Sequence, residues 1–249
     1  MKNLIQDELE LAKSKMIDDF SFMGNKLVRL TQENVAIVEA MIRNDSAYIR
    51  SSDVDAEPQN KYGGSTAYWM TLLKKYLFEG EQGTKLSYES IIKGAVEAVD
   101  RENSTHLNAD KCGRSEIIDR ISKFDKKEFV ECLRNPEYKD MKLFTIISDK
   151  TKAQERARTN PSFASKFCHY ACFYIFEGTE YQDNYSIYDG ILKTVLPWYL
   201  DYYKIKQVFN LKDYKQYRNA VDFIREEAEE KLSRNGFDHL LWYYHKGRV

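Results

Sequence analysis

Apolar side chains recur at helical spacing along most of this 249-residue chain. The most regular segment follows Ser87, and its apolar positions are Tyr88, Ile91, Ile92, Ala95, Val96 and Val99. Steps of three and four residues place these side chains on one face of a helix. Ser87 belongs to a residue type that caps helix N-termini through a side-chain oxygen. The pattern therefore predicts a helix that begins after Ser87 and buries one face in a core.

The same periodicity predicts helices elsewhere, and polar residues mark several of their starts. The other segments with helical spacing lie at residues 5–16, 35–42, 67–78, 117–124, 165–176 and 212–232. Asp125 forms a capping-box-like start with Glu128, which predicts a helix that ends near Leu133. Asp189 and Thr31 each stand before an apolar helical segment, in the position of an N-cap.

Polar, turn-rich residues separate these segments. Residues 46–64 and 100–113 are predicted to be loops, and the aromatic segment 236–248 is predicted to be a short final helix. Residues 143–147 form an apolar run that fits either a strand or a helix. Because no useful period-2 alternation occurs, we expect an all-α protein of about ten helices.

Composition places the chain among ordinary soluble globular proteins. Hydrophobic residues make up 43% and charged residues 31%, with only 11 Gly and 4 Pro. At this length we expect a single helical unit over residues 1–249, or two lobes at 1–113 and 114–249. No apolar run approaches the roughly 20 residues of a membrane-spanning helix, and the charged N-terminus lacks the apolar core of a signal peptide. These features predict a cytoplasmic protein with no membrane partner.

The charges of the chain nearly cancel. There are 38 Lys and Arg against 39 Asp and Glu, which gives a net charge of −1. Dedicated nucleic-acid-binding proteins are usually basic, so the net charge gives no support for that function. A local basic face remains open, because the electrostatic field depends on how charges are distributed.

The four cysteines are too few and too scattered for a disulfide scaffold. They are Cys112, Cys132, Cys168 and Cys172. Cys168 and Cys172 lie four residues apart with His169 between them, so a shared metal ion is one interpretation. Two small buried side chains are the favoured interpretation, because free cysteine is among the most buried residue types. We therefore expect no metal site.

One segment carries residues suited to covalent chemistry. Residues 160–166 have the sequence NPSFASK, in which Pro161 is expected to end a helix and Lys166 to open the next one after a tight turn. The positive end of a helix dipole disfavours an ammonium group and so lowers the pKa of a lysine there. A neutral lysine amine is a nucleophile towards sugar or carbonyl carbon. Asp189 follows 23 residues later and is expected to remain ionised, so it can stabilise a developing positive charge.

Aromatic residues are abundant after this segment. Tyr and Trp alternate with Lys between residues 185 and 206, and a second aromatic cluster lies at residues 242–245. Such a mixture fits a nucleic-acid surface. It fits a packed helix with a solvated face equally well, and both interpretations stay open.

The segment around Lys166 resembles the helix-hairpin-helix DNA glycosylase superfamily, in particular its 8-oxoguanine DNA glycosylase branch. In that family a hairpin of the form PGVGTK ends on the catalytic lysine, and an aspartate about twenty residues later completes the site. Pro161, Ser165, Lys166 and Asp189 match the family's proline, threonine, lysine and aspartate. The likeness covers roughly residues 159–200. It implies that Lys166 and Asp189 are catalytic.

The resemblance also implies roles for further residues. Ser162, Ala164 and Ser165 would form the hairpin that contacts the DNA backbone, although Ser162 and Ala164 replace two glycines and tolerate less of the required geometry. Tyr170 replaces the cysteine that stacks on the base and is expected to stack on the base in its place, whereas Ile191 replaces a phosphate-binding histidine. A C-terminal aromatic residue closes the base pocket in such enzymes, and Trp242 or Tyr243 is expected to do so here.

Two functions follow from these observations. The first is a bifunctional DNA glycosylase and abasic-site lyase for an oxidised purine such as 8-oxoguanine, with damaged DNA as partner and no cofactor. The second is a catalytically altered module of the same fold that binds a modified base, a nucleotide or a protein partner. Some bacterial proteins with this fold look like accessory components of anti-phage defence operons, so a partner encoded in the same operon is part of this second hypothesis.

Overall fold

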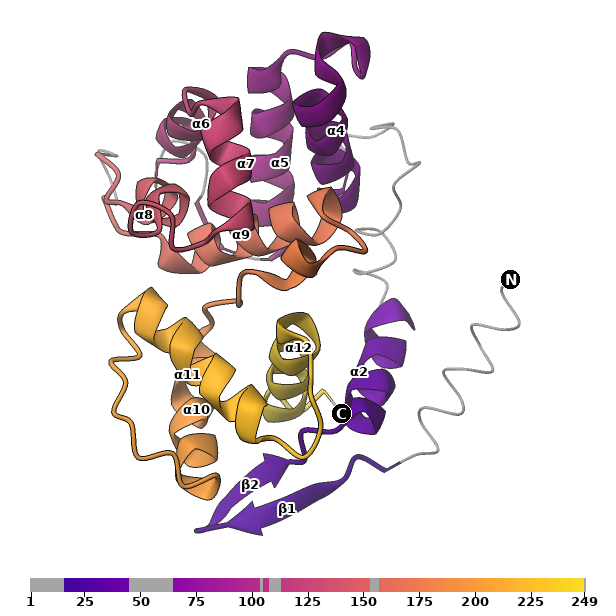
Figure 1. The fold of residues 1–249 in the computed structure, drawn as a ribbon, viewed down its shortest axis with the longest axis vertical. Helices are drawn as coiled ribbons and strands as arrows, with labels where there is room; N and C mark the ends of the chain where they lie inside the picture. The colour runs from indigo at the N-terminus through magenta and orange to yellow at the C-terminus, as the bar shows by residue number, and fades with distance from the viewer. Residues whose placement is uncertain (1–15, 45–64, 104, 108–112, 153–156, 249) are drawn as a thin grey trace. The chain divides into compact units, whose positions relative to one another are not determined.

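A computed structural model describes residues 16–44, 65–103, 105–107, 113–152 and 157–248 (Figure 1). This part of the chain forms ten α-helices, two short 3-10 helices and one β-hairpin. The predominantly helical prediction is confirmed, and the hairpin is an addition to it. The helix expected at residues 5–16 lies outside the described residues except for Met16, and so does the loop expected at residues 46–64.

The chain divides into two compact units. Unit 1 combines Met1–Ile49 with Ser186–Val249, and unit 2 is Arg50–Tyr185. The division expected at residue 113 differs from this one, because the helices on either side of residue 113 pack against each other in unit 2. The first segment of the chain instead packs with the last one.

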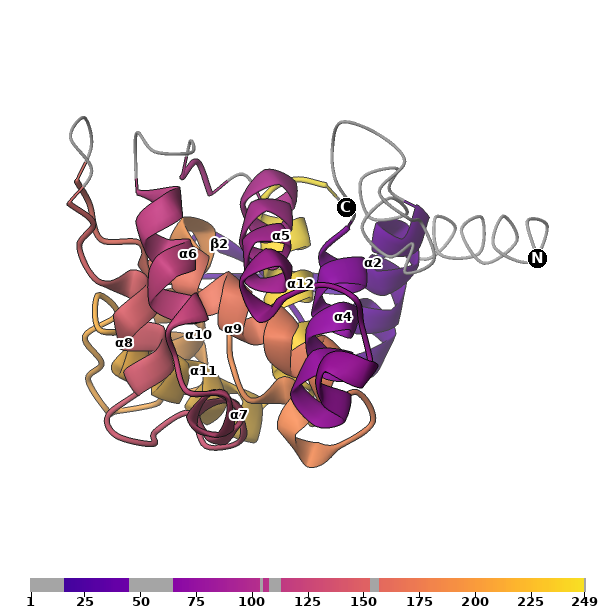
Figure 2. The same ribbon diagram turned by 90° about the horizontal axis from the view of Figure 1, so that it is seen from above.

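Unit 2 is built around one apolar helix. Its helices are α4 (Thr66–Glu79), α5 (Tyr88–Glu102), α6 (Arg114–Ser122), α7 (Lys126–Arg134), α8 (Lys142–Ser148) and α9 (Pro161–Ile175), with 3-10 helices η1 (Gly80–Gln82) and η3 (Glu180–Asp183). Helix α9 contacts α4, α5, α7 and α8 (Figure 2). Its side chains Phe163, Phe167 and Cys172 are almost completely buried. The core of unit 2 therefore forms around the segment that carries Lys166.

Unit 1 packs a hairpin and four helices. Strands β1 (Asp19–Phe22) and β2 (Asn25–Val28) are antiparallel, and the helices are α2 (Gln32–Asn44), α10 (Gly190–Tyr202), α11 (Tyr214–Glu227) and α12 (Arg234–His245). Helix α12 packs on α2, and α10 contacts β2, α11 and α12. Met23 and Gly24 form the turn of the hairpin, both with positive φ. Such angles at both central residues are typical of tight hairpin turns.

The predicted caps of four helices are confirmed, and the Thr31 hydroxyl before α2 accepts a hydrogen bond from the Asn34 backbone N–H. Ser87 accepts a hydrogen bond from the Ser90 backbone N–H, and Asp125 accepts one from Glu128. Asp189 accepts one from the N–H of Ile191 at 2.8 Å. These bonds satisfy backbone donors that the first turn of a helix leaves unpaired.

Two expected boundaries differ from the structure, and one run that was left open is now assigned. The loop expected from Asp100 begins later, because α5 continues to Glu102 and buries Asp100. The ambiguous run at residues 143–147 is helical, within α8. The long helix expected at residues 212–232 is shorter, since α11 ends at Glu227. Among the described residues, no helix is long and apolar enough to cross a membrane.

Candidate functional site

Helix α9 begins earlier than the sequence predicted, and this is a correction. Asn160 is the N-cap and Pro161 is the first helical residue, so residues 161–166 are helix rather than hairpin. Proline suits this position because its fixed φ is helical and the first helical N–H needs no partner within the helix. Pro161 is therefore the start of a helix and not the end of one.

The three residues assigned to a DNA-binding hairpin are accordingly helical. Ala164 and Ser165 are completely buried, and the Ser165 hydroxyl donates to the carbonyl oxygen of Ser162 at 3.0 Å. Buried side chains inside a helix cannot form the loop that approaches a phosphate. The backbone contact expected from Ser162, Ala164 and Ser165 is therefore not supported by this geometry.

Lys166 lies in the second turn of α9, whereas it was expected in the first turn. The helix dipole acts mainly within the first turn, so the expected activation of Lys166 by the dipole has little structural basis. The side chain is half-buried, and its amine donates to the carbonyl oxygen of Asn103 at 3.3 Å. Lys166 is therefore directed towards the C-terminal end of α5, where Asn103 is the cap.

Tyr170 lies one turn further along α9 and reaches the same residue. Its hydroxyl donates to Asn103 Oδ1 at 3.0 Å. The Asn103 amide group donates in turn to the carbonyl oxygen of Val99 at 3.1 Å. Asn103 therefore fixes Lys166 and Tyr170 together at the end of α5. No sequence pattern pointed to Asn103, because it lies 63 residues before Lys166 and belongs to no motif.

Asp189 belongs to the other unit. It begins α10 in unit 1, whereas Lys166 lies in unit 2. Its half-buried carboxylate is engaged by the N–H of Ile191, so it acts as the predicted N-cap. The joint catalytic role of Lys166 and Asp189 stays a prediction.

The aromatic residues expected to close a base pocket lie on α12 of unit 1. Trp242 and Tyr243 are both half-buried, with ring centroids 5.1 Å apart. The Lys246 amine lies 4.1 Å from the centroid of the Trp242 ring, within the range of a cation–π interaction. Their role towards a base stays a prediction.

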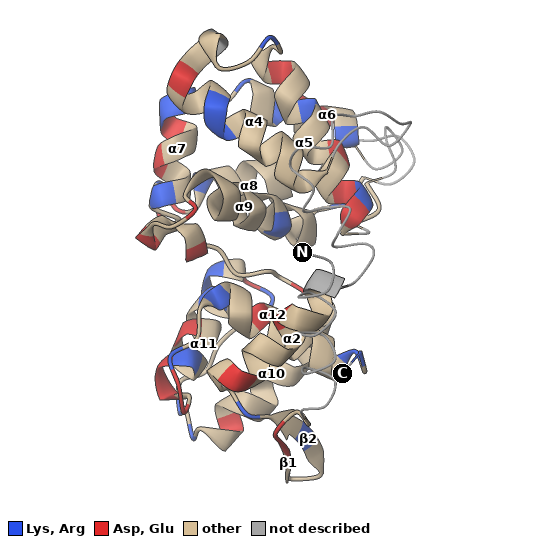
Figure 3. Cartoon of the chain, turned by 90° about the vertical axis from the view of Figure 1, so that its right-hand side faces the viewer, with Lys and Arg blue, Asp and Glu red and all other residues tan. Residues whose placement is uncertain are grey.

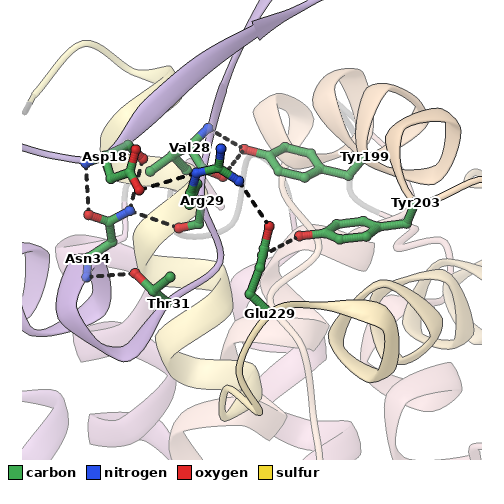
Figure 4. Close-up of polar contacts among 8 residues, drawn as sticks. All are labelled: Asp18, Val28, Arg29, Thr31, Asn34, Tyr199, Tyr203 and Glu229. Atoms are coloured by element: carbon green, nitrogen blue, oxygen red, sulfur yellow. Dashed lines mark hydrogen bonds and ion pairs between the residues drawn. The ribbon is translucent and has the colours of Figure 1, made fainter.

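The tyrosines after residue 185 are mostly structural. Tyr188 and Tyr199 are buried, and Figure 4 shows the Tyr199 hydroxyl at the backbone of Val28. The same view shows Glu229 accepting from the Tyr203 hydroxyl and pairing with Arg29. These contacts fasten the hairpin to α10 and to the segment after α11. They favour the interpretation of a packed helix over that of a nucleic-acid surface.

A half-buried histidine completes this part of unit 1. His245 Nε2 lies 3.2 Å from the Tyr199 hydroxyl, and the ring also contacts Trp198 and Tyr244. Burial lowers the pKa of His245 to about 4, because desolvation disfavours the charged imidazolium. The imidazole is therefore neutral at pH 7.

The cysteines near Lys166 are buried and packed. Cys168 and Cys172 have no exposed surface, and the Cys172 thiol donates to the carbonyl oxygen of Leu133. Burial raises the pKa of the Cys168 thiol well above its usual range. His169 is also buried, with Nδ1 2.8 Å from the carbonyl oxygen of Tyr185. No group of three or more metal-ligating side chains lies together among the described residues.

Charges of both signs are interspersed on the helices. Helix α7, for example, carries Lys126, Lys127 and Arg134 together with Glu128 and Glu131, and Figure 3 shows both colours on it. Several are paired, such as Glu128 with Lys139 and Lys142. Single-sign fields are what steer a protein towards nucleic acid, so any basic site must be local.

Comparisons of the chain with protein-family models, with curated proteins and with solved structures find no match. The resemblance to DNA glycosylases therefore rests on the residues around Lys166 and on Asp189 alone.

Proposed function

We propose that the chain is a bifunctional DNA glycosylase and abasic-site lyase that acts on an oxidised purine such as 8-oxoguanine. The observation that carries the proposal is the position of Lys166. Its half-buried amine is held at the Asn103 carbonyl, and the Tyr170 hydroxyl is fixed on the same residue. The amine of Lys166 and the hydroxyl of Tyr170 both hydrogen-bond to Asn103. This arrangement suits a reaction in which a nucleophile forms a bond while a neighbouring group transfers a proton.

Lys166 is the nucleophile in this proposal. After its ammonium group loses a proton, the amine attacks C1′ of a nucleotide flipped out of the duplex, and the base leaves with the electrons of the glycosidic bond. Opening of the sugar ring and loss of the amine proton give a Schiff base. Removal of a proton from C2′ then breaks the 3′ C–O bond and nicks the strand. Hydrolysis of the Schiff base returns the lysine.

Asp189 supplies negative charge in this proposal. Its carboxylate stabilises the positive charge that develops on the sugar as the base departs. The N–H of Ile191 fixes the direction of the Asp189 carboxylate at the start of α10. Trp242 or Tyr243 would close on the flipped base. No metal or organic cofactor is needed for these steps.

The start of α9 favours a second candidate function. Because α9 begins at Pro161, residues 161–166 form a helix at the place where the glycosylase family has the hairpin that contacts a DNA phosphate. A module of this kind would bind a modified base, a nucleotide or a protein partner without excising anything. Anti-phage defence is a setting for such a module.

Borohydride trapping tests the first candidate. The protein is mixed with labelled duplexes that carry 8-oxoguanine or an abasic site, and reduction converts any Schiff base into a stable adduct. We expect an adduct with the wild type and none with Lys166→Gln. Lys193→Gln is the matched control, because Lys193 is another half-buried helical lysine, with its amine 4.1 Å from the Tyr188 ring centroid.

The control variant should form the adduct as the wild type does. If folded wild-type protein gives no adduct on either duplex, the lyase proposal is wrong and the binding module remains. An adduct that persists in Lys166→Gln would show that another amine is the nucleophile.

A further inference from the structure

Arg158 is an arginine with an unusual set of partners. Its guanidinium is half-buried and donates from Nε to Asn160 Oδ1 at 3.1 Å. Nη2 donates to the carbonyl oxygens of Thr105 and His106, both at 2.8 Å. These three hydrogen bonds fix the plane of the guanidinium between the start of α9 and the residues after α5.

No carboxylate balances this charge within the described part of the chain. Six other arginines there form ion pairs with Asp or Glu, namely Arg29, Arg101, Arg114, Arg120, Arg225 and Arg234. All partners of Arg158 are neutral oxygens. A guanidinium carries five N–H groups, so the two on Nη1 have no partner among the described residues. A fixed, charged donor edge is therefore available to a ligand.

The two carboxylates at the end of α5 are already engaged, and Glu102 accepts from the Thr66 N–H and pairs with Arg101. Asp100 is buried and pairs with Arg114 at 2.7 Å. It also accepts from the Thr105 hydroxyl and from the N–H of Leu107. These contacts account for both of its oxygens, so Asp100 organises the residues after α5 and leaves Arg158 without a counter-charge.

A second cation reaches the same residues. The Lys166 amine donates to the carbonyl oxygen of Asn103, two residues before the Thr105 carbonyl that Arg158 holds. Both cations come from one segment, since Arg158 precedes the Asn160 cap and Lys166 lies in the second turn of α9. Two cationic donors thus approach the C-terminal end of α5 together.

We propose that Arg158 and Lys166 form a binding site for a phosphate group. Guanidinium is the preferred side chain for phosphate because its N–H groups match the oxygens in pairs. A phosphate dianion would also balance two positive charges, whereas a carboxylate carries only one. The site goes beyond the proposed lyase reaction and does not require it, because it needs Lys166 as a donor and not as a nucleophile.

Calorimetric titration of the full chain with inorganic phosphate at low ionic strength tests this site. We expect saturable binding by the wild type, much weaker binding of acetate, and a loss of affinity of about tenfold or more in Arg158→Gln. Arg134→Gln is the matched control, because it removes an exposed arginine from the same unit. That control should bind phosphate as the wild type does.

Variants of Lys166 separate this proposal from the proposed function. Lys166→Arg keeps the charge but cannot form a Schiff base, so it should bind phosphate and give no borohydride adduct. Lys166→Gln should bind phosphate several-fold more weakly, and it decides the matter if Arg158→Gln does not fold. The absence of saturable phosphate binding by the wild type, or an equal loss in Arg134→Gln, would overturn the site.

Titration with a nucleoside 5′-monophosphate identifies the source of the phosphate. Tighter binding than that of inorganic phosphate assigns the site to a nucleotide. Equal affinity assigns it to the phosphate group alone. Both results support the proposed site.

Discussion

A single glycine allows two helices of unit 2 to approach closely. Gly94 lies in the middle of α5, and a Cβ built there would meet the Trp69 ring of α4 at 2.3 Å. Real Cβ atoms do not approach other atoms so closely, so either the indole or the helix must move. Glycine normally weakens a helix interior, and here the tight packing of Trp69 explains its presence.

We predict that Gly94→Ala destabilises the protein in spite of the better helix propensity of alanine. The overlap with Trp69 should lower the free energy of unfolding by about 2 kcal/mol, as overpacking of a core does. Urea denaturation followed by circular dichroism measures the change. Gly190→Ala is the control, because no atom lies within 4 Å of its added Cβ. Equal stability of the two variants would show that Trp69 yields without cost.

The candidate site also shows what a residue pattern cannot reveal. Lys166 was identified from its neighbours in sequence, but its partner Asn103 and the carbonyl partners of Arg158 were not. Both side chains donate to carbonyl oxygens at the end of α5 or just after it, and these partners are 52 to 63 residues away in sequence. Such pairings follow from the packing of α5 against α9, and no local spacing encodes them.

At the scale of the element, Asp189 has two separable roles. Its carboxylate caps α10, and the proposed function assigns its charge to catalysis. Asparagine caps helices about as well as aspartate but carries no charge. Alanine neither caps a helix nor carries a charge. The two substitutions therefore distinguish the roles.

We predict that Asp189→Ala lowers the free energy of unfolding by about 1 kcal/mol, and that Asp189→Asn leaves it nearly unchanged. Both variants should give at least tenfold less borohydride adduct if the carboxylate stabilises the transition state. Thermal denaturation and the trapping assay measure the two effects. Full adduct formation by Asp189→Asn would restrict this residue to its capping role.

Most helix starts could be predicted from the sequence, but whether a helix ends or begins at Pro161 could not. Ser87, Asp125 and Asp189 were identified because an N-cap depends on residues within three positions. Proline signals either the end of one helix or the first turn of the next. The prediction placed Pro161 at a helix end, whereas it is the first residue of α9.

The hairpin of unit 1 escaped prediction for a different reason. Each strand has only four residues, so the alternation of its side chains is too short to recognise. Its stability comes from distant partners, since Tyr199 holds the backbone of Val28 and Tyr244 donates to Asp19 at 2.6 Å. Isolated two-stranded hairpins are marginal in water, so these long-range contacts decide whether the strands form.

At the scale of the whole molecule, unit 2 is continuous in sequence and unit 1 is not. The core of unit 2 is made by residues within Arg50–Tyr185, including the packing of α9 on α4, α5, α7 and α8. Unit 1 needs both ends of the chain, because α12 packs on α2 and α10 packs on β2. The two units should therefore differ in their ability to fold as fragments.

We predict that a fragment of residues 50–185 unfolds cooperatively on heating, with the helical circular dichroism of a folded domain. A fragment of residues 186–249 should show no cooperative transition, because it lacks the hairpin and α2. Calorimetry of both fragments measures this difference. A cooperative transition in the C-terminal fragment alone would show that α10, α11 and α12 form a sufficient core.

The separation of Val28 from Tyr199 in sequence also determines how long Val28 waits for its partner during synthesis. These partners are 171 residues apart, so ribosomes that add about 5–20 residues per second need roughly 9–34 seconds between them. During that interval the apolar residues Leu27, Val28 and Leu30 have been made, but the helix that covers them has not. Unit 2 can complete its own core in the meantime. In the nascent chain, unit 2 can therefore fold while the segment around Val28 still lacks its partners and is prone to aggregation. That segment is the natural target of a chaperone.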